Sequence, residues 1–341
     1  MSLRSAIDHA SGPIGEAIER GLLPGAVLGA VDAAGDRVVF VAGNAQLEPD
    51  RVPMARGTVF DLASLTKPIF TTTVLLEHVA SAAIGLEQPL SELIPDLRQH
   101  DLQAPERQLT IRECLTHRTF LPAVEPLYTL GLEPATLEAY VLQRSWQPGP
   151  PVYSDINFIL LGILIERLSR SPLSEHVVPL GFTFTPAAEC CAATEWCPWR
   201  RRMLRGEVHD ENACAFGGAA GHAGLFGTID ATLDFGIALL QTAPDPRHPT
   251  QLLMRRETPD RTLGWQMSSP GWSGGELSSK RCIGHTGFTG TGLWVDFDLG
   301  IAWSLLTNRV HPSRHAPSVT LQLRPLVADR LNAEIRRSTE R

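Results

Sequence analysis

The stretch VFDLASLTKPIFTTT, residues 59–73, brings a serine and a lysine to the start of a helix. Two apolar residues open it and predict the end of a short strand. Apolar residues then recur after Ser64 with helical spacing, which predicts a buried helix. Pro68 falls in the first turn, where a missing N–H costs least. Ser64 is therefore predicted at a helix N-terminus, with Lys67 one turn further along the same face.

A serine and a lysine at this spacing can form a nucleophile and its activating group. Serine is a weak nucleophile at neutral pH, and it needs a neighbouring base or a cation that keeps such a base ionised. Lys67 could supply either. The spacing alone, however, is more often a capping serine followed by a surface lysine. Its meaning therefore depends on partner motifs further along the chain.

Composition places the chain in the globular class and narrows its partners. Of its 341 residues 43% are hydrophobic and 20% are charged, and no apolar run is long enough to span a bilayer. The formal net charge of -7 argues against a nucleic-acid partner. The six cysteines are expected to be reduced thiols. Residues 1–21 predict an amphipathic helix rather than a secretory signal, so a cytoplasmic location is expected, with a trimmed leader as the alternative.

Strand-like runs lie near both ends of the chain, and helical patterns fill the middle. Runs at 25–31 and 37–41 predict a hairpin, and four further strands are predicted at 263–267, 281–284, 292–297 and 301–306, followed by a helix over 319–335. This pattern predicts one α/β (α+β) domain over 1–341, with an antiparallel sheet flanked by terminal helices. The sheet lobe takes about 1–60 plus 258–341, and a helical lobe of about 61–257 is inserted. Residues 172–212 show no clear period and are expected to be irregular.

Tyr153 lies between a run of prolines and an apolar helix predicted from about residue 156. Near a lysine ammonium, a tyrosine hydroxyl loses its proton more readily because the cation favours the anion. Tyr153 could therefore be a general base. The alternative is a ring that only packs against the helix start. Ser154 or Asp155 is the natural N-cap of that helix.

The segment His285-Thr286-Gly287-Phe288 follows a predicted strand at the edge of the sheet. Thr286 offers a hydroxyl, and Gly287 would let a substrate lie against the strand. The N–H of Phe288, together with that of Ser64, could form an oxyanion hole. His285 could position a substrate or move protons, or it could be an ordinary hydrogen-bonded histidine.

Neither a cofactor nor a metal is expected. The glycine-rich loop 216–227 lacks the Lys-Ser/Thr of a phosphate-binding loop. Three consecutive residues, His209, Asp210 and Glu211, do not easily converge on one ion.

Three motifs occur in order along the chain: Ser64-Leu65-Thr66-Lys67, Tyr153-Ser154-Asp155 and His285-Thr286-Gly287. In this order the chain resembles the serine β-lactamase-like family, which includes class C β-lactamases, D-alanyl-D-alanine carboxypeptidases, D-aminopeptidases and esterases. The resemblance implies the β-lactamase/transpeptidase-like fold. It also implies that Ser64 is the acylated nucleophile, that Lys67 helps to take its proton, and that Tyr153 is the base that returns a proton to the leaving group. Thr286 and Gly287 would line the substrate-binding edge.

Two residues depart from the family pattern. Asp155 stands where the family has asparagine, and an ionised carboxylate accepts hydrogen bonds but cannot donate them. Asp155 is therefore expected either to cap the helix or to pair with Lys67. His285 stands where the family has lysine, so a substrate carboxylate is held less firmly until the imidazole protonates near its usual pKa of roughly 6.5.

The sequence thus predicts a serine hydrolase that works through an acyl-enzyme. Its substrate would be a small molecule or a peptide, and an ester, an amide, a D-amino-acid peptide and a β-lactam all stay open. The alternative is a catalytically silent, penicillin-binding-like sensor or scaffolding protein. The oligomeric state is left open.

Overall fold

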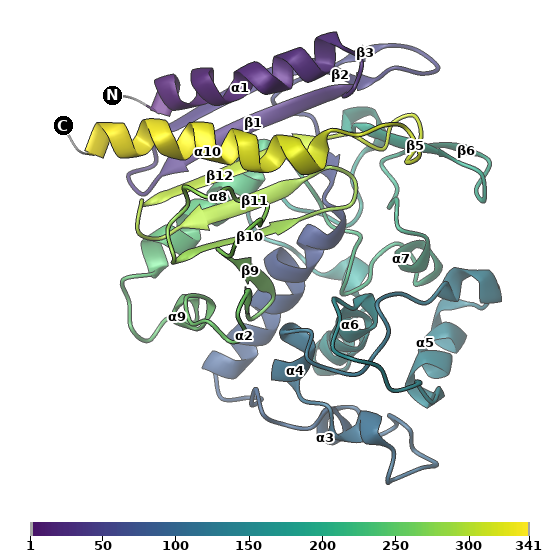
Figure 1. Ribbon diagram of the computed structural model, residues 1–341. Helices are drawn as coiled ribbons and strands as arrows, with labels where there is room; N and C mark the ends of the chain where they lie inside the picture. Colours follow the sequence, from purple (N-terminus) through teal and green to yellow (C-terminus); the bar gives the residue numbers. More distant parts are fainter. Residues whose placement is uncertain (1–2, 340–341) are drawn as a thin grey trace.

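The structure is a computed structural model that describes residues 3–339, and an eight-stranded antiparallel sheet lies at its centre (Figure 1). The sheet consists of β1 Gly25–Asp32, β2 Arg37–Gln46, β3 Val52–Pro53, β8 Arg261–Thr262, β9 Trp265–Met267, β10 Cys282–Thr286, β11 Gly292–Asp296 and β12 Ile301–Thr307. Its order is β3-β2-β1-β12-β11-β10-β9-β8. Strands from the two ends of the chain therefore share one antiparallel sheet, as predicted, and they meet at the β1–β12 pair.

Side chains of β1 alternate between two hydrophobic cores, because successive residues of a strand face opposite sides. Leu28 and Ala30 belong to the core beneath the terminal helices, whereas Val27 and Val31 belong to the core on the other face. The terminal helices α1 Leu3–Glu19 and α10 Thr320–Thr339 lie side by side over the first face (Figure 1). The predicted sheet flanked by terminal helices is confirmed.

Helix α8, Ile229–Thr242, packs on the second face of the sheet against β1 and β12. Two glycines allow this close approach: a Cβ at Gly29 would lie 2.9 Å from Ile229, and one at Gly236 would lie 2.5 Å from Ala302. Although α8 falls inside the range predicted for a helical lobe, it packs as part of the sheet layer. The proposed division into two lobes stays a prediction.

Helix α6 is buried along most of its length and packs against α4 and against the π-helix over Lys67–Thr72. Residues 156–165 of α6 are all buried, so the apolar run predicted there is a core helix. The side chain of Ser154 caps it by accepting from the Asn157 N–H at 3.4 Å, which leaves Asp155 free for another role. The helices besides α1, α8 and α10 are α2 Thr73–Ala80, α3 Leu90–Leu93, α4 Ile111–Leu115, α5 Pro134–Gln143, α6 Asp155–Ser169, α7 Glu211–Ala215 and α9 Thr250–Leu253.

Two local predictions were wrong. Residues 172–212, expected to be irregular, contain the hairpin of β5 Ala193–Cys197 and β6 Arg202–Arg205. These strands are short and their pairing is irregular, so no period could be read from the sequence. The helix after Ser64 is also not α-helical at its start: a 3-10 turn over Ala63–Leu65 and a π-helix over Lys67–Thr72 precede α2.

None of the helices in the described part of the chain combines the length and the apolar character needed to cross a bilayer.

Candidate active site

A strained turn places Ser64 at the end of a short strand. Strand β4, Phe60–Asp61, pairs with β7, Phe226–Gly227, and Ala63 then adopts a φ of +47°, which is costly for a residue with a Cβ. The buried carboxylate of Asp61 accepts the Ala63 N–H at 2.8 Å and the His209 N–H at 2.6 Å. Burial raises the pKa of Asp61, although these hydrogen bonds oppose the shift. Asp61 therefore ties the turn before the serine to a distant segment.

The ammonium of Lys67 is fully buried, and three acceptors surround it. It lies 2.8 Å from Ser64 Oγ, 2.8 Å from Asp155 Oδ1 and 3.1 Å from the carbonyl oxygen of His222. Burial alone would lower the pKa of Lys67, but the charges and hydrogen bonds of Asp155 and Tyr153 outweigh it and raise the pKa to about 12. Lys67 is therefore a cation at neutral pH, and Asp155 is its counter-ion rather than a helix cap.

The ring of Tyr153 lies among cationic and imidazole groups. Its centre is 5.0 Å from Lys67 Nζ, 4.5 Å from the centre of the His117 ring and 5.4 Å from Arg261 Cζ. His117 accepts the Ser154 N–H at Nδ1 over 3.0 Å. Burial, followed by the charges of Arg261 and Lys67, lowers the pKa of His117 well below its usual value. The sequence had suggested no role for His117 or Arg261.

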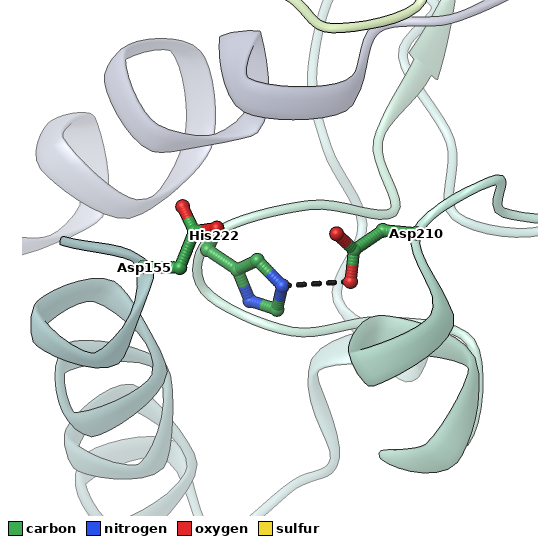
Figure 2. A group of neighbouring side chains, drawn as sticks. All are labelled: Asp155, Asp210 and His222. Carbon is green, nitrogen blue, oxygen red and sulfur yellow. Dashed lines mark hydrogen bonds and ion pairs between the residues drawn. The ribbon is translucent and has the colours of Figure 1, made fainter. Parts of the chain in front are cut away.

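Within residues 3–339, two groups of side chains have the geometry to hold a metal ion, but in each group a cation already pairs with at least one carboxylate. Asp155, Asp210 and His222 form the first group. Figure 2 shows Asp155 and Asp210 on opposite sides of the His222 ring, whose Nε2 donates to Asp210 Oδ1 at 2.9 Å. The Lys67 ammonium already neutralises Asp155 there. The donor sets therefore suit ion pairing rather than a metal ion.

The second group is Glu195, Cys197 and Glu211. The guanidinium of Arg314 bridges its two carboxylates, at 2.5 Å from Glu195 and 2.6 Å from Glu211. The carboxylates of this second group are thus also neutralised by ion pairs, which makes them poor ligands for a metal ion.

His285 is neutral, which corrects one prediction. Its Nδ1–H donates to the Thr286 carbonyl at 3.0 Å, and the ring is 3% exposed. Burial, and then the charges of Lys67 and Arg261, lower the pKa of His285 well below 6.5. The expectation that this imidazole becomes a cation near its usual pKa was therefore wrong.

The segment after β10 lies directly against the turn that carries Ser64. A Cβ at Gly287 would come within 2.4 Å of the Leu62 carbonyl oxygen, so only glycine fits. The hydroxyls of Thr289 and Thr291 donate to the carbonyls of Asp61 and Leu62, at 2.7 and 3.1 Å. These contacts bring Phe288 to the same side of the molecule as Ser64.

A cleft of about 560 Å³ collects the predicted residues. Of these, Ser64, Tyr153, Asp155, His285, Thr286 and Phe288 line it. Lys67 lies behind Ser64, and Gly287 contacts the turn that carries Ser64. The cleft is also lined by residues that the sequence did not assign to a site, among them Arg261, Gln266, Arg314 and the segment 209–211. No local pattern marks Arg261, because only the pairing of β8 with β9 and of β9 with β10 brings it to the cleft.

Comparison with known proteins identifies the family of this chain. The Beta-lactamase family profile matches residues 14–326. The chain is 30% identical over 321 residues to an N-acetylmuramyl-L-alanine amidase of Bacillus subtilis, covering 76% of this chain and 69% of that protein. It is also 30% identical over 314 residues to a putative D-alanyl-D-alanine carboxypeptidase of Salmonella agona, covering 77% and 72%.

Solved structures of this fold also superpose over nearly the whole chain. A class C β-lactamase from Rhodobacter sphaeroides aligns with a TM-score of 0.72 at 18% identity, covering 97% of this chain and 99% of that one. With the family profile matched over most of its length, this chain belongs to the Beta-lactamase family and is a serine hydrolase of that family.

Proposed function

We propose that the protein hydrolyses an ester or amide through an acyl-enzyme on Ser64, with Tyr153 as the general base. The observation that carries this is the set of contacts of Lys67. The Lys67 ammonium donates to Ser64 Oγ and to the His222 carbonyl oxygen, and it pairs with Asp155 Oδ1 at 2.8 Å. Because the hydroxyl of Ser64 accepts from Lys67, its own proton is free for transfer to another group.

Tyr153 is the group best placed to take that proton. Its ring borders both Lys67 and the cleft. Lys67, with a pKa of about 12, has no free lone pair at neutral pH, so we do not give it the share in proton removal that the family resemblance implied. Its role is to orient Ser64 and to stabilise the anion of the base. Tyr153 would then return the proton to the leaving group.

The N–H groups of Ser64 and Phe288 are the proposed oxyanion hole. Arg324 Nη2 donates to the Gly287 carbonyl at 3.0 Å. In a trans peptide the C=O of one residue and the N–H of the next point in opposite directions. The Phe288 N–H is thus turned away from Arg324, which supports a direction toward the cleft.

Arg261 supports a substrate that carries a negative charge. With His285 neutral, the family's lysine cation is absent from the substrate strand. Arg261 lines the same cleft, and its nearest ion pair in the described chain is a 3.8 Å contact with the half-exposed Asp260. Its guanidinium is therefore available to a substrate carboxylate. We propose a peptide or amino-acid amide that ends in a carboxylate, in keeping with the names of the amidase and carboxypeptidase relatives.

A hydrolysis panel tests this function. The substrates are p-nitrophenyl acetate, nitrocefin, N-acetylmuramyl-L-alanine and a D-alanyl-D-alanine peptide, each with wild type and Ser64→Ala. Turnover by wild type and its loss in a folded Ser64→Ala variant is the expected result. A fluorophosphonate probe that labels Ser64, together with no turnover of any substrate, would instead favour the sensor.

Arg261→Gln tests the charge on the substrate. It should raise KM for the peptides at least ~10-fold, the effect of one charge-assisted hydrogen bond of about 1.5 kcal/mol or more, and leave KM for p-nitrophenyl acetate nearly unchanged. The matched control is Arg281→Gln, which removes an exposed arginine that pairs with Asp298. Equal effects on neutral and acidic substrates would exclude Arg261 as the anchor.

A further inference from the structure

A second cavity, of about 360 Å³, lies beside the substrate strand. It shares Thr286 and Phe288 with the cleft, but its other walls come from Gly287, from the segment after β12 and from the first turns of α10. Its lining consists of Thr286, Gly287, Phe288, Arg309, Ser318, Thr320, Leu321 and Arg324. Two of these residues are arginines and none is acidic.

Arg324 is a buried cation with no counter-ion in the part of the chain described. It is 5% exposed, and its Nη2 donates to the carbonyls of Gly287 and Thr291 at 3.0 and 2.9 Å. Its Nε is buried and has no hydrogen-bond partner there. Burial and then the charge of Arg309 lower the pKa of Arg324 to about 10, so it still carries its charge at neutral pH. A buried charge without an opposite charge is costly unless something pairs with it.

Arg309 adds a second positive charge to the same cavity. Its Nε donates to the Phe288 carbonyl at 2.7 Å, and its guanidinium lies 4.5 Å from the centre of the Phe288 ring. Burial and the charge of Arg314 lower the pKa of Arg309. Residues 3–339 contain no carboxylate within ion-pair distance of it. Two neighbouring guanidinium groups therefore repel each other in a space that an anion could occupy.

The start of α10 adds the positive end of a helix dipole. Thr320 and Leu321 line the cavity and open a helix of 20 residues, and its dipole favours an anion there. The N–H groups of Thr320, Gln322 and Leu323 already donate to Ser318 Oγ and to the Val319 carbonyl. The hydroxyls of Ser318 and Thr320 lie 2.9 Å apart at the same place. Charge, dipole and hydroxyl donors thus all converge on one cavity.

We propose that this cavity binds a small oxyanion, which could be a free phosphate or sulfate or a carboxylate of the substrate. The anion would neutralise Arg324 and Arg309. Because these arginines hold the carbonyls of Gly287, Phe288 and Thr291, it would also stabilise the loop that carries the Phe288 N–H. The proposal does not depend on which bond the enzyme cleaves.

Leu321→Glu tests the site without removing either arginine. Leu321 is 76% exposed and lines the cavity, so a glutamate there should fold and should offer the arginines an internal anion. The control is Leu326→Glu on the same helix, where the leucine is 44% exposed and lies outside the cavity lining. Melting temperatures are measured against sodium phosphate, with sodium chloride keeping the ionic strength constant.

Wild type and Leu326→Glu should both show a saturable rise, on the order of 2 °C at twenty times Kd, and Leu321→Glu should show none. An equal rise in melting temperature for all three proteins, or no rise for wild type, would overturn the proposal. Ser64→Ala should respond like wild type, which separates this result from any failure of the hydrolase assignment.

The source of the anion is decided by kinetics. KM is measured for p-nitrophenyl acetate and for mono-p-nitrophenyl succinate, with and without phosphate. If phosphate raises KM only for the succinate, and not in Leu321→Glu, the substrate's own carboxylate occupies the cavity. If phosphate leaves both values unchanged while raising the melting temperature, the occupant is a free anion.

Discussion

Replacing Asp155 with asparagine restores the family's residue and removes the counter-ion of Lys67. The two groups lie 2.8 Å apart, with the lysine side chain fully buried and the aspartate side chain 18% exposed. Breaking a buried ion pair costs about 3–5 kcal/mol. Asparagine can still accept a hydrogen bond from Lys67, and the aspartate is partly solvated, so we expect a loss of about 2 kcal/mol. For a chain of this length that corresponds to a melting temperature lower by about 3 °C.

The same substitution should change substrate preference. The amide of asparagine can donate to a substrate carbonyl, which the Asp155 carboxylate cannot. One added hydrogen bond is worth about 1–1.5 kcal/mol, so the ratio of kcat/KM for nitrocefin to that for p-nitrophenyl acetate should rise about tenfold. The pKa of Lys67 should also fall, because Asp155 is the largest of the groups that raise it.

The assays are calorimetry and steady-state kinetics with both substrates. Asp230→Asn is the matched control, since Asp230 pairs with Arg56 and Arg37 at the surface. A variant whose substrate ratio and melting temperature both stay within error of wild type would refute the view that Asp155 balances Lys67 and faces the substrate.

Three further outcomes are expected. Tyr153→Phe should slow acylation at least ~100-fold, the low end for loss of a general base. If the acylation rate measured by stopped flow falls less than tenfold, Tyr153 has only a packing role. Asp61→Asn should slow labelling of Ser64 about 10-fold or more, and Ala63→Gly in the same chain should recover most of it, because glycine adopts a φ of +47° without strain; no recovery would contradict a positioning role. His117 and His285 have folded pKa values below their unfolded value of about 6.5. The unfolded chain therefore binds more protons on acidification, and stability, full above pH ~6.5, should fall below it by up to ~1.4 kcal/mol per pH unit for each histidine. Urea titrations at several pH values should show that the unfolding free energy of His285→Gln changes less with pH than that of wild type. An unchanged dependence on pH would contradict this.

The strands and the motif residues could be predicted because their signals are local. Runs of β-forming apolar residues located β1, β2 and β12, and the spacing of Ser64 and Lys67 predicted one helical face. The capping box at α4 is similarly local: Thr110 and Glu113 satisfy each other's backbone donors. Each of these features depends on residues only a few positions apart.

Other features depend on segments that are distant in the sequence. Asp155 pairs with Lys67 rather than capping its helix because the segment that carries Ser64 and Lys67 lies beside it. The sequence around Asp155 gives no information about that neighbour. The lowered pKa of His285 likewise depends on its burial in the folded chain and then on the charges of Lys67 and Arg261. Arg261 itself reaches the cleft through β9 and β10, so its contribution could be seen only in the folded chain.

The two departures from the family pattern make physical sense together with Arg261. A lysine at position 285 would have been a further cation beside the buried Lys67 and the partly buried Arg261. Burial, and then the charges of these two residues, already lower the pKa of the imidazole at that position. Neutral His285 avoids that repulsion and still donates to the Thr286 carbonyl. Asp155 cancels the charge of Lys67 within the site. Of the two arginines that line the cleft, Arg314 pairs closely with Glu195 and Glu211, whereas Arg261 has only a 3.8 Å contact with Asp260. We therefore infer that Arg261 takes the place of the lysine as the carboxylate anchor, on β8 rather than β10, two strands further toward the edge of the sheet.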